Sequence, residues 1–313
     1  MDTSSNRPRQ HTLDLLWSLW AELGVSGWSR RHQNWCIDPE PLIFFTATHG
    51  DLDPRLRDES TDWCIRYGRF ISAVRLKALL KKATPAAQQA FGEYAATVAA
   101  HSGLRWPGAT EVRPHRPSAK SQVETFSSAS QLALRLRALL GVGARAEILR
   151  ALLTWPCGDP AISAAALTSV VLYSKRNVLE ELESLRMAGT LHVSAAGNRH
   201  IYRLQHPKAL AALLGPLPSV CPNWIALFAV LEALLGLAAK EPGVDSVVRA
   251  VEANGVMQRR KADLAAMTPS LHSVWPAPPS SPANGGPLAW LASFDAWAIA
   301  FTEALATGRA APS

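Results

Sequence analysis

The sequence has few cysteines, and none is arranged for metal binding. Its four cysteines are widely spaced and form no CxxC pair: Cys36, Cys64, Cys157 and Cys221. Structural zinc sites and disulfide frameworks need several closely placed cysteines. The spacing therefore predicts reduced thiols with no metal and no cofactor, as expected of a cytoplasmic protein.

Long apolar runs are also missing. The first residues, MDTSSNRPRQHT, contain no apolar core of a secretion signal. The most apolar stretch, residues 224–239, includes Glu232 and is shorter than the roughly 20 residues that span a bilayer. We therefore expect a buried helix at residues 224–239 and no membrane partner.

Recognisable catalytic motifs are absent as well. No GxSxG, HExxH, Walker-type or GxGxxG sequence occurs where a strand, turn and helix would support it. An imidazole and two carboxylates lie close in sequence at His49, Asp51 and Asp53, as in a metal or carboxylate-pair site. A helix that ends at Gly50 and a new helix capped by Asp53 explain these residues better. The sequence predicts no enzyme.

Basic residues outnumber acidic ones. The net charge is +7 and the isoelectric point is about 9.5, while 48% of the residues are hydrophobic. This composition indicates a folded protein with a preference for polyanionic partners. Between Arg55 and Lys82 there are eight basic and three acidic side chains. That stretch is either a solvated helical face or a second nucleic-acid contact.

Helix signals dominate the chain, so we predict a mainly α protein. Helices should start at Asp38-Pro39, Asp53-Pro54 and Thr84-Pro85, where a capping residue precedes proline. We expect four segments: a helical N-terminal domain (1–102), a Pro/Ser-rich basic linker (103–130), a central domain (131–208) and a helical C-terminal region (209–313). We expect the linker to be flexible or extended; the alternative is that it lies along the surface of the domains that it joins.

The C-terminal region should contain three helices. They are predicted at residues 223–239, at residues 245–267 and from Pro287 onward, with a Pro-, Ser- and Gly-rich loop over residues 269–287. The second helix should direct its valines inward, namely Val247, Val248, Val251 and Val256.

The most informative pattern lies between Arg145 and Leu204. It contains an amphipathic helix at residues 145–154, a short helix capped by Ser163 and a third helix capped by Ser174 that stops at Gly189. The inward face of the third helix should consist of Val178, Leu179, Leu182 and Leu185. Two short strands follow, LHVSA and RHIYRL, around a Gly-Asn turn. Three helices followed by a hairpin predict a winged helix-turn-helix with a small β-hairpin wing.

The segment resembles the winged-helix regulators of the MarR and ArsR type. The resemblance consists of the two helices, the basic N-capped third helix, the exit AGTL and the wing ending YRL. It implies a bacterial-type transcriptional regulator, such as a repressor, that binds double-stranded DNA as a homodimer. ArsR-type regulators often sense metals through cysteine or histidine pairs, which these helices lack, so metal sensing is not carried over.

The predicted DNA-binding residues lie at two places. At the start of the third helix, Arg176 and Asn177 are placed to meet base edges and Lys175 to meet a phosphate. The remaining predicted contacts are to phosphates and a flanking groove, from the preceding turn (Tyr173, Ser174) and from the wing (Asn198, Arg199, His200).

Two other functions remain open. Winged helices also bind proteins. In the far half of the third helix the carboxylates of Glu180, Glu181 and Glu183 would repel the phosphates of DNA. The chain would then be a protein-interaction or antitoxin-type subunit whose helical flanks bind an operon-encoded partner and whose winged helix autoregulates the operon. A nucleic-acid-processing enzyme that uses the winged helix for docking would need a catalytic cleft, for which the sequence offers no residues.

Overall fold

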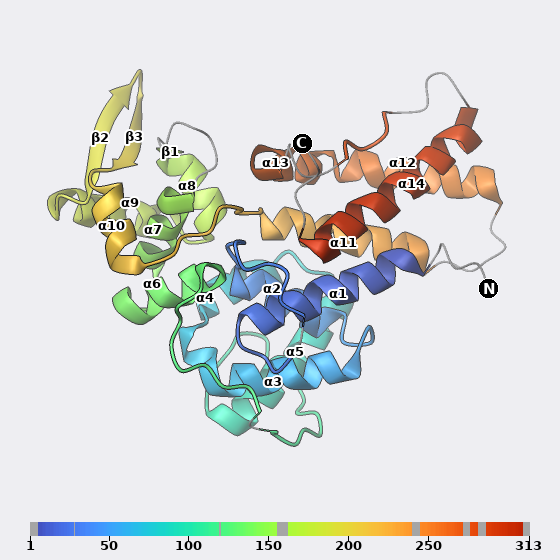
Figure 1. Ribbon diagram of the computed structural model, residues 1–313, viewed down its shortest axis with the longest axis horizontal. Helices are drawn as coiled ribbons and strands as arrows, with labels where there is room; N and C mark the ends of the chain where they lie inside the picture. The colour runs from blue at the N-terminus through green and yellow to red at the C-terminus, as the bar shows by residue number, and fades with distance from the viewer. Residues whose placement is uncertain are drawn as a thin grey trace. The chain divides into compact units, whose positions relative to one another are not determined.

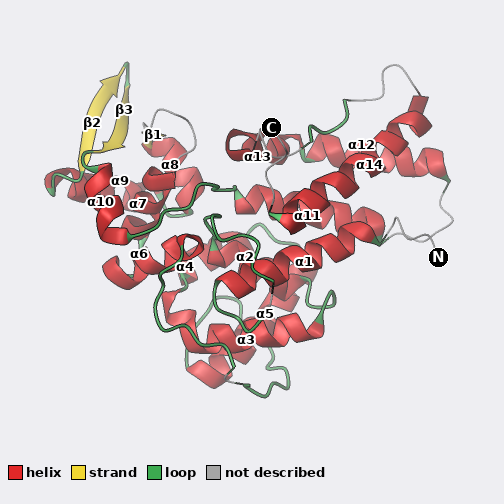
Figure 2. Cartoon of the chain, viewed as in Figure 1, coloured by secondary structure: helices red, strands yellow, loops and turns green. Residues whose placement is uncertain are grey.

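The computed structural model describes residues 6–27, 29–118, 120–154, 162–239, 245–271, 276–280 and 286–308. These residues form a mainly helical protein with one small three-stranded antiparallel sheet, which confirms the predicted class (Figure 1, Figure 2). The chain divides into two compact units, residues 20–221 and residues 1–19 with 222–313. The division differs from the four predicted segments, because the helices of residues 39–102 share a unit with residues 131–208.

Four helices form the first part of the 20–221 unit. They are α2 (Pro39–Thr48), α3 (Pro54–Tyr67), α4 (Ala73–Leu80) and α5 (Pro85–Ser102), and α5 packs on both α2 and α3. The predicted caps of α3 and α5 are confirmed. Asp53 accepts a hydrogen bond from the amide of Arg55 at 2.8 Å, and Thr84 accepts one from the amide of Ala87 at 3.3 Å.

Two buried indoles anchor the core of this part. Trp20, near the end of α1 (Arg7–Glu22), and Trp63 in α3 lie edge to face with their ring centroids 5.6 Å apart. Each indole N–H is satisfied, that of Trp20 by the hydroxyl of Thr46 at 2.9 Å and that of Trp63 by the carbonyl of Leu23 at 2.8 Å. Burial of two such large rings with satisfied donors stabilises the helical part strongly.

The described part of residues 103–130 lies along these helices, which agrees with the alternative and not with a flexible linker. The amide of Thr110 donates to the carbonyl of Gly92 at 3.1 Å. His115 Nε2 lies 2.7 Å from Asp62, whose carboxylate also accepts the amide of Ser118. A Cβ at Gly92 would come within 2.5 Å of the carbonyl oxygen of Gly108, so a glycine permits this close approach.

A helix-and-hairpin group forms the second part of the 20–221 unit. Its elements are α6 (Leu132–Leu140), α7 (Ala144–Thr154), β1 (Ile162–Ser163), α8 (Ala164–Val171), α9 (Lys175–Met187), β2 (Leu191–Ala196) and β3 (Arg199–Leu204). The predicted helices and both hairpin strands are confirmed in position. Strand β1 was not predicted, and it completes a sheet of order β1-β3-β2 in which Ile162 pairs with Tyr202 and Leu191 with Leu204.

This group has its own hydrophobic core. Ile148 of α7, Leu167 of α8 and Val178 of α9 are fully buried together. The prediction for α9 was wrong at Leu179, which is 41% exposed. Val178, Leu182 and Leu185 are buried as expected, so the apolar face of α9 is one residue narrower than the sequence pattern suggested.

The last elements of the 20–221 unit bring its two ends together. Helix α10 (Pro207–Leu214) follows β3, and Gly215 ends it. The chain then returns to the segment before α2, where Trp35 and Val220 form a parallel bridge. The amide of Cys36 donates to the carbonyl of Val220 at 2.7 Å.

In the other unit, every described element of regular secondary structure is a helix. It contains the start of α1 together with α11 (Trp224–Ala238), α12 (Ser246–Arg259), α13 (Lys261–Leu271) and α14 (Gly286–Thr307), and α12 packs on α14 while α11 packs on α13. His11 Nδ1 lies 3.1 Å from the hydroxyl of Thr302 and joins α1 to α14.

Two predictions for this unit were wrong. The single helix expected over residues 245–267 is two helices, α12 and α13. Three of its valines are exposed rather than inward, with exposed fractions of 46% for Val247, 49% for Val248 and 65% for Val251. Ala250, Ala253 and Met257 form the buried face of α12 instead, because the small alanines allow the helix to approach its neighbours closely.

One described helix, α14, is long and apolar enough to cross a membrane by length and composition. Of its most apolar 18-residue window, 44% is buried inside the structure. Core helices of soluble proteins have the same length and composition, so this feature is weak evidence for a membrane span.

Candidate nucleic-acid interface

The first turn of α9 presents three polar side chains to solvent. Ser174 caps the helix, accepting a hydrogen bond from the amide of Asn177 at 3.2 Å and donating one to its side-chain oxygen at 2.8 Å. Lys175, Arg176 and Asn177 are all exposed. The exposed amides of a helix N-terminus and two adjacent cations make this turn suited to a phosphate backbone.

Arg176 has one protein partner. Its Nε lies 2.8 Å from the carboxylate of Glu180, one turn later, and the side chain is 87% exposed. The hydrogen bond and negative charge of Glu180 raise the pKa of Arg176, which stays charged. An exposed pair of this kind contributes little stability, so the guanidinium can exchange Glu180 for a base or phosphate.

The acidic residues further along α9 also have cationic partners. Glu181 lies 2.8 Å from Arg145 of α7, and Glu183 pairs with Arg186 one turn later. These pairs reduce the negative charge that the sequence placed on the far half of the helix. Ion pairing therefore lessens the repulsion that α9 would exert on a polyanion.

The tip of the β2–β3 hairpin is the second exposed basic place. Gly197 and Asn198 form the two-residue turn, with Gly197 at a positive φ of 58°. Asn198, Arg199 and His200 are exposed. The hairpin thus exposes one guanidinium and one imidazole at its end.

Tyr173 does not lie on this surface, contrary to the prediction. It is 8% exposed, and its hydroxyl lies 2.7 Å from that of Ser72 at the start of α4. Burial is the main cause of the raised pKa of Tyr173. The residue connects the turn before α9 to the N-terminal helices and is unavailable to a phosphate.

A buried cluster of charged residues lies beneath the helix-and-hairpin group. It consists of three carboxylates and three arginines: Asp38, Glu40, Glu147, Arg75, Arg137 and Arg150. Asp38 and Glu40 belong to the start of α2, Arg75 to α4, Arg137 to α6, and Glu147 and Arg150 to α7. All six side chains are at least nine-tenths buried. The cluster therefore joins α7 to the N-terminal helices.

Glu147 is the centre of this cluster. Its two oxygens accept hydrogen bonds from Arg137 at 2.6 and 2.8 Å, from Arg75 at 2.9 Å and from Arg150 at 2.9 Å. Burial favours the neutral carboxyl, but Arg137, Arg75 and Arg150 outweigh it and hold the pKa of Glu147 well below its usual value. The same balance, with Arg75 and Arg150, lowers the pKa of Asp38.

No pattern in the sequence indicates this cluster. Asp38 was expected to cap α2, and it occupies the N-cap position, but its carboxylate binds Arg75 and makes no cap hydrogen bond. Arg75 was counted in a basic stretch expected to face solvent or nucleic acid, yet it is fully buried. Residues so far apart in sequence leave no local pattern.

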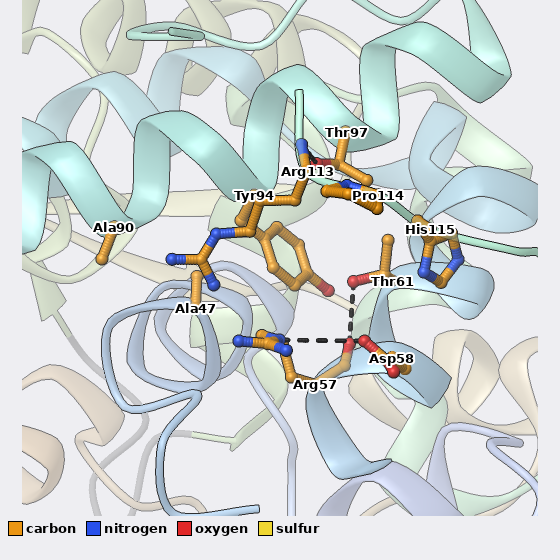
Figure 3. Close-up of a pocket in the computed structure, with 10 residues that line it drawn as sticks. All are labelled: Ala47, Arg57, Asp58, Thr61, Ala90, Tyr94, Thr97, Arg113, Pro114 and His115. Carbon is orange, nitrogen blue, oxygen red and sulfur yellow. Dashed lines mark hydrogen bonds and ion pairs between the residues drawn. The ribbon is translucent and has the colours of Figure 1, made fainter. Parts of the chain in front are cut away.

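A small polar pocket lies elsewhere, between α3, α5 and the segment that follows α5. Figure 3 shows Arg57, Arg113 and His115 around the ring of Tyr94, with Arg57 paired to Asp58 at 3.8 Å. The cavity holds only about 30 Å³, far less than the several hundred Å³ of a typical ligand pocket. Among the described residues no group of three or more His, Cys, Asp or Glu could hold a metal ion.

No protein-family profile, no curated protein and no solved structure matches this chain.

Proposed function

We propose that residues 144–204 form a winged helix-turn-helix that binds duplex DNA, and that the protein regulates transcription. The topology supports this. The order α7-β1-α8-α9-β2-β3 with a sheet of order β1-β3-β2 agrees with this proposal, in which α9 would be the recognition helix and the β2–β3 hairpin the wing.

The observation that carries the proposal is the exposure of basic side chains at both contact places of such a domain. Lys175 and Arg176 lie at the start of α9, and Arg199 lies at the hairpin tip. In this arrangement Arg176 contacts a base edge and Lys175 a phosphate, while Arg199 enters the neighbouring groove.

The buried cluster would make the DNA-binding element rigid. Glu147 and Arg150 of α7 and the hydroxyl of Tyr173 are bonded to residues of the N-terminal helices. Residues 20–221 would then dock on DNA as one body. This preserves the orientation of α9 and reduces the entropy lost on binding.

Fluorescence anisotropy tests the proposal. The full chain is titrated against a duplex from upstream of its own gene and against a shuffled duplex of equal length. Tighter binding to the first is expected, and Lys175→Ala/Arg176→Ala should weaken that binding about ten- to hundredfold, since a base contact contributes about 1–3 kcal/mol.

Lys81→Ala/Lys82→Ala is the matched control. These lysines are also adjacent and exposed, but they lie in the turn after α4, so their loss removes equal charge from another surface. The control should bind nearly as tightly as the unmodified protein. Equal weakening by both double variants, or equal binding to both duplexes, would contradict sequence-specific contact through α9.

One observation favours the alternative of a protein-interaction subunit. The exposed valines of α12, Val247, Val248 and Val251, form an apolar face that water alone covers poorly. Such a face fits a homodimer or an operon-encoded protein partner. This function is supported if a partner co-purifies at fixed stoichiometry and is lost from the Val248→Asp/Val251→Asp variant. It is opposed if light scattering gives the same molar mass for the variant and for the unmodified protein.

A further inference from the structure

Two cysteines far apart in sequence meet at the bridge that brings the ends of the 20–221 unit together. The amide of Cys36 donates to the carbonyl of Val220 at 2.7 Å, next to the parallel pairing of Trp35 and Val220. The thiols of Cys36 and Cys221 form a hydrogen bond with each other.

The two thiols have different surroundings. Cys36 is 1% exposed and lies beside Arg150 of the buried cluster, whereas Cys221 is only half-buried. The hydrogen bond from Cys221 and the positive charge of Arg150 outweigh burial and lower the pKa of Cys36. The bond to Cys36 and burial raise the pKa of Cys221. Of the two thiols, Cys36 is therefore the one disposed to act as a nucleophile.

We propose that Cys36 and Cys221 are a redox-active pair that closes to an intramolecular disulfide in the presence of a peroxide. Hydrogen peroxide transfers an oxygen atom to one of the two sulfurs, giving a sulfenic acid and one water. The other thiol then attacks the sulfenic sulfur, the S–S bond forms and a second water leaves. The two thiols lose two protons and two electrons in total, and the peroxide is reduced to two waters.

The disulfide would join the segment that follows α10 covalently to the segment that precedes α2. The loop between Cys36 and Cys221 contains every element from α2 to α10. Closing so long a loop restricts the unfolded chain and should raise the Tm of this unit by about 5–10 °C.

Peptide mapping of the full chain after peroxide treatment tests the proposal. Trypsin places the four cysteines on separate peptides, covering residues 32–55, 58–66, 151–175 and 209–240. After alkylation of remaining thiols, the expected product is a reducible link between peptides 32–55 and 209–240, together with the rise in Tm. The readout needs no DNA, so it is independent of the proposed function.

Three variants complete the test. Cys64→Ser should leave the link intact, because Cys64 is buried against Tyr94 and away from the pair. Cys36→Ser and Cys221→Ser should each abolish both the link and the Tm rise, because the disulfide needs both sulfurs. A link from Cys221 to Cys157, which is outside the described residues, would overturn the proposal. Persistence of both thiols at peroxide concentrations that oxidise exposed methionine would overturn it too.

Discussion

Replacement of Glu147 by glutamine should be among the most destabilising conservative changes in the protein. The carboxylate binds three buried arginines through both of its oxygens. Oε1 accepts from Arg137, and Oε2 accepts from Arg75 and Arg150. Whichever way the amide is oriented, its NH2 group faces arginine N–H donors, so at least two hydrogen bonds are lost.

The cost follows from charge as well as from hydrogen bonds. The intact cluster has three positive and three negative groups, and Glu147→Gln leaves one arginine charge uncompensated among buried neighbours. Removal of one partner from a buried ion pair typically costs about 3–5 kcal/mol of unfolding free energy. We expect a loss in this range.

Urea unfolding followed by tryptophan fluorescence measures the effect, since Trp20, Trp35 and Trp63 are buried in the same unit. The midpoint should fall while the slope m stays unchanged. Glu181→Gln is the matched control. Glu181 also binds an arginine at 2.8 Å, but the two side chains are 30% and 46% exposed, so its loss should cost less than about 1 kcal/mol. Equal costs for the two variants would refute the reasoning.

Three further predictions follow from the same geometry. The pKa values of Glu147 and Asp38 in the folded protein lie below their ordinary values of 4.5 and 3.8, so their stabilisation is complete above those values and is lost as pH falls below them. Stability measured from pH 6 to 3 should therefore fall more steeply in the unmodified protein than in Glu147→Gln. Tyr173→Phe removes the hydrogen bond to Ser72 and should cost about 0.5–1.5 kcal/mol of stability with unchanged DNA affinity; lost affinity at unchanged stability would place the hydroxyl on DNA. Arg199→Ala should reduce the slope of log affinity against log salt by about 1, and an unchanged slope would remove the hairpin tip from the phosphate contacts.

Local signals in the sequence predicted local structure well. Ser163 and Ser174 were recognised as caps, and each accepts the expected amide hydrogen bond, from Ala166 and Asn177 respectively. The two hairpin strands were placed to within a residue, because Gly197 and Asn198 form a turn between alternating side chains. Capping and turn chemistry depend on a few neighbouring residues, so a single sequence reveals them.

Features that depend on distant residues were not predictable. Tyr173 was predicted to contact a phosphate because it precedes a basic helix. Its hydroxyl instead forms a buried hydrogen bond with Ser72, which is far away in sequence. The valines of α12 were assigned to the core by their hydrophobicity, although the narrower residues Ala250 and Ala253 make the packed face. Hydrophobic periodicity indicates that a helix has a buried face, but the neighbouring helices decide which residues form it.

The first turn of α9 is proposed to contact bases. The Arg176→Ala variant tests this contact most directly. Its affinity is measured by anisotropy for the duplex from upstream of the gene and for the shuffled duplex. The account predicts a loss of about 1–3 kcal/mol on the first duplex and a much smaller loss on the second. An equal loss on both duplexes would make Arg176 a phosphate contact, and no loss on either would contradict a role for α9 in DNA recognition.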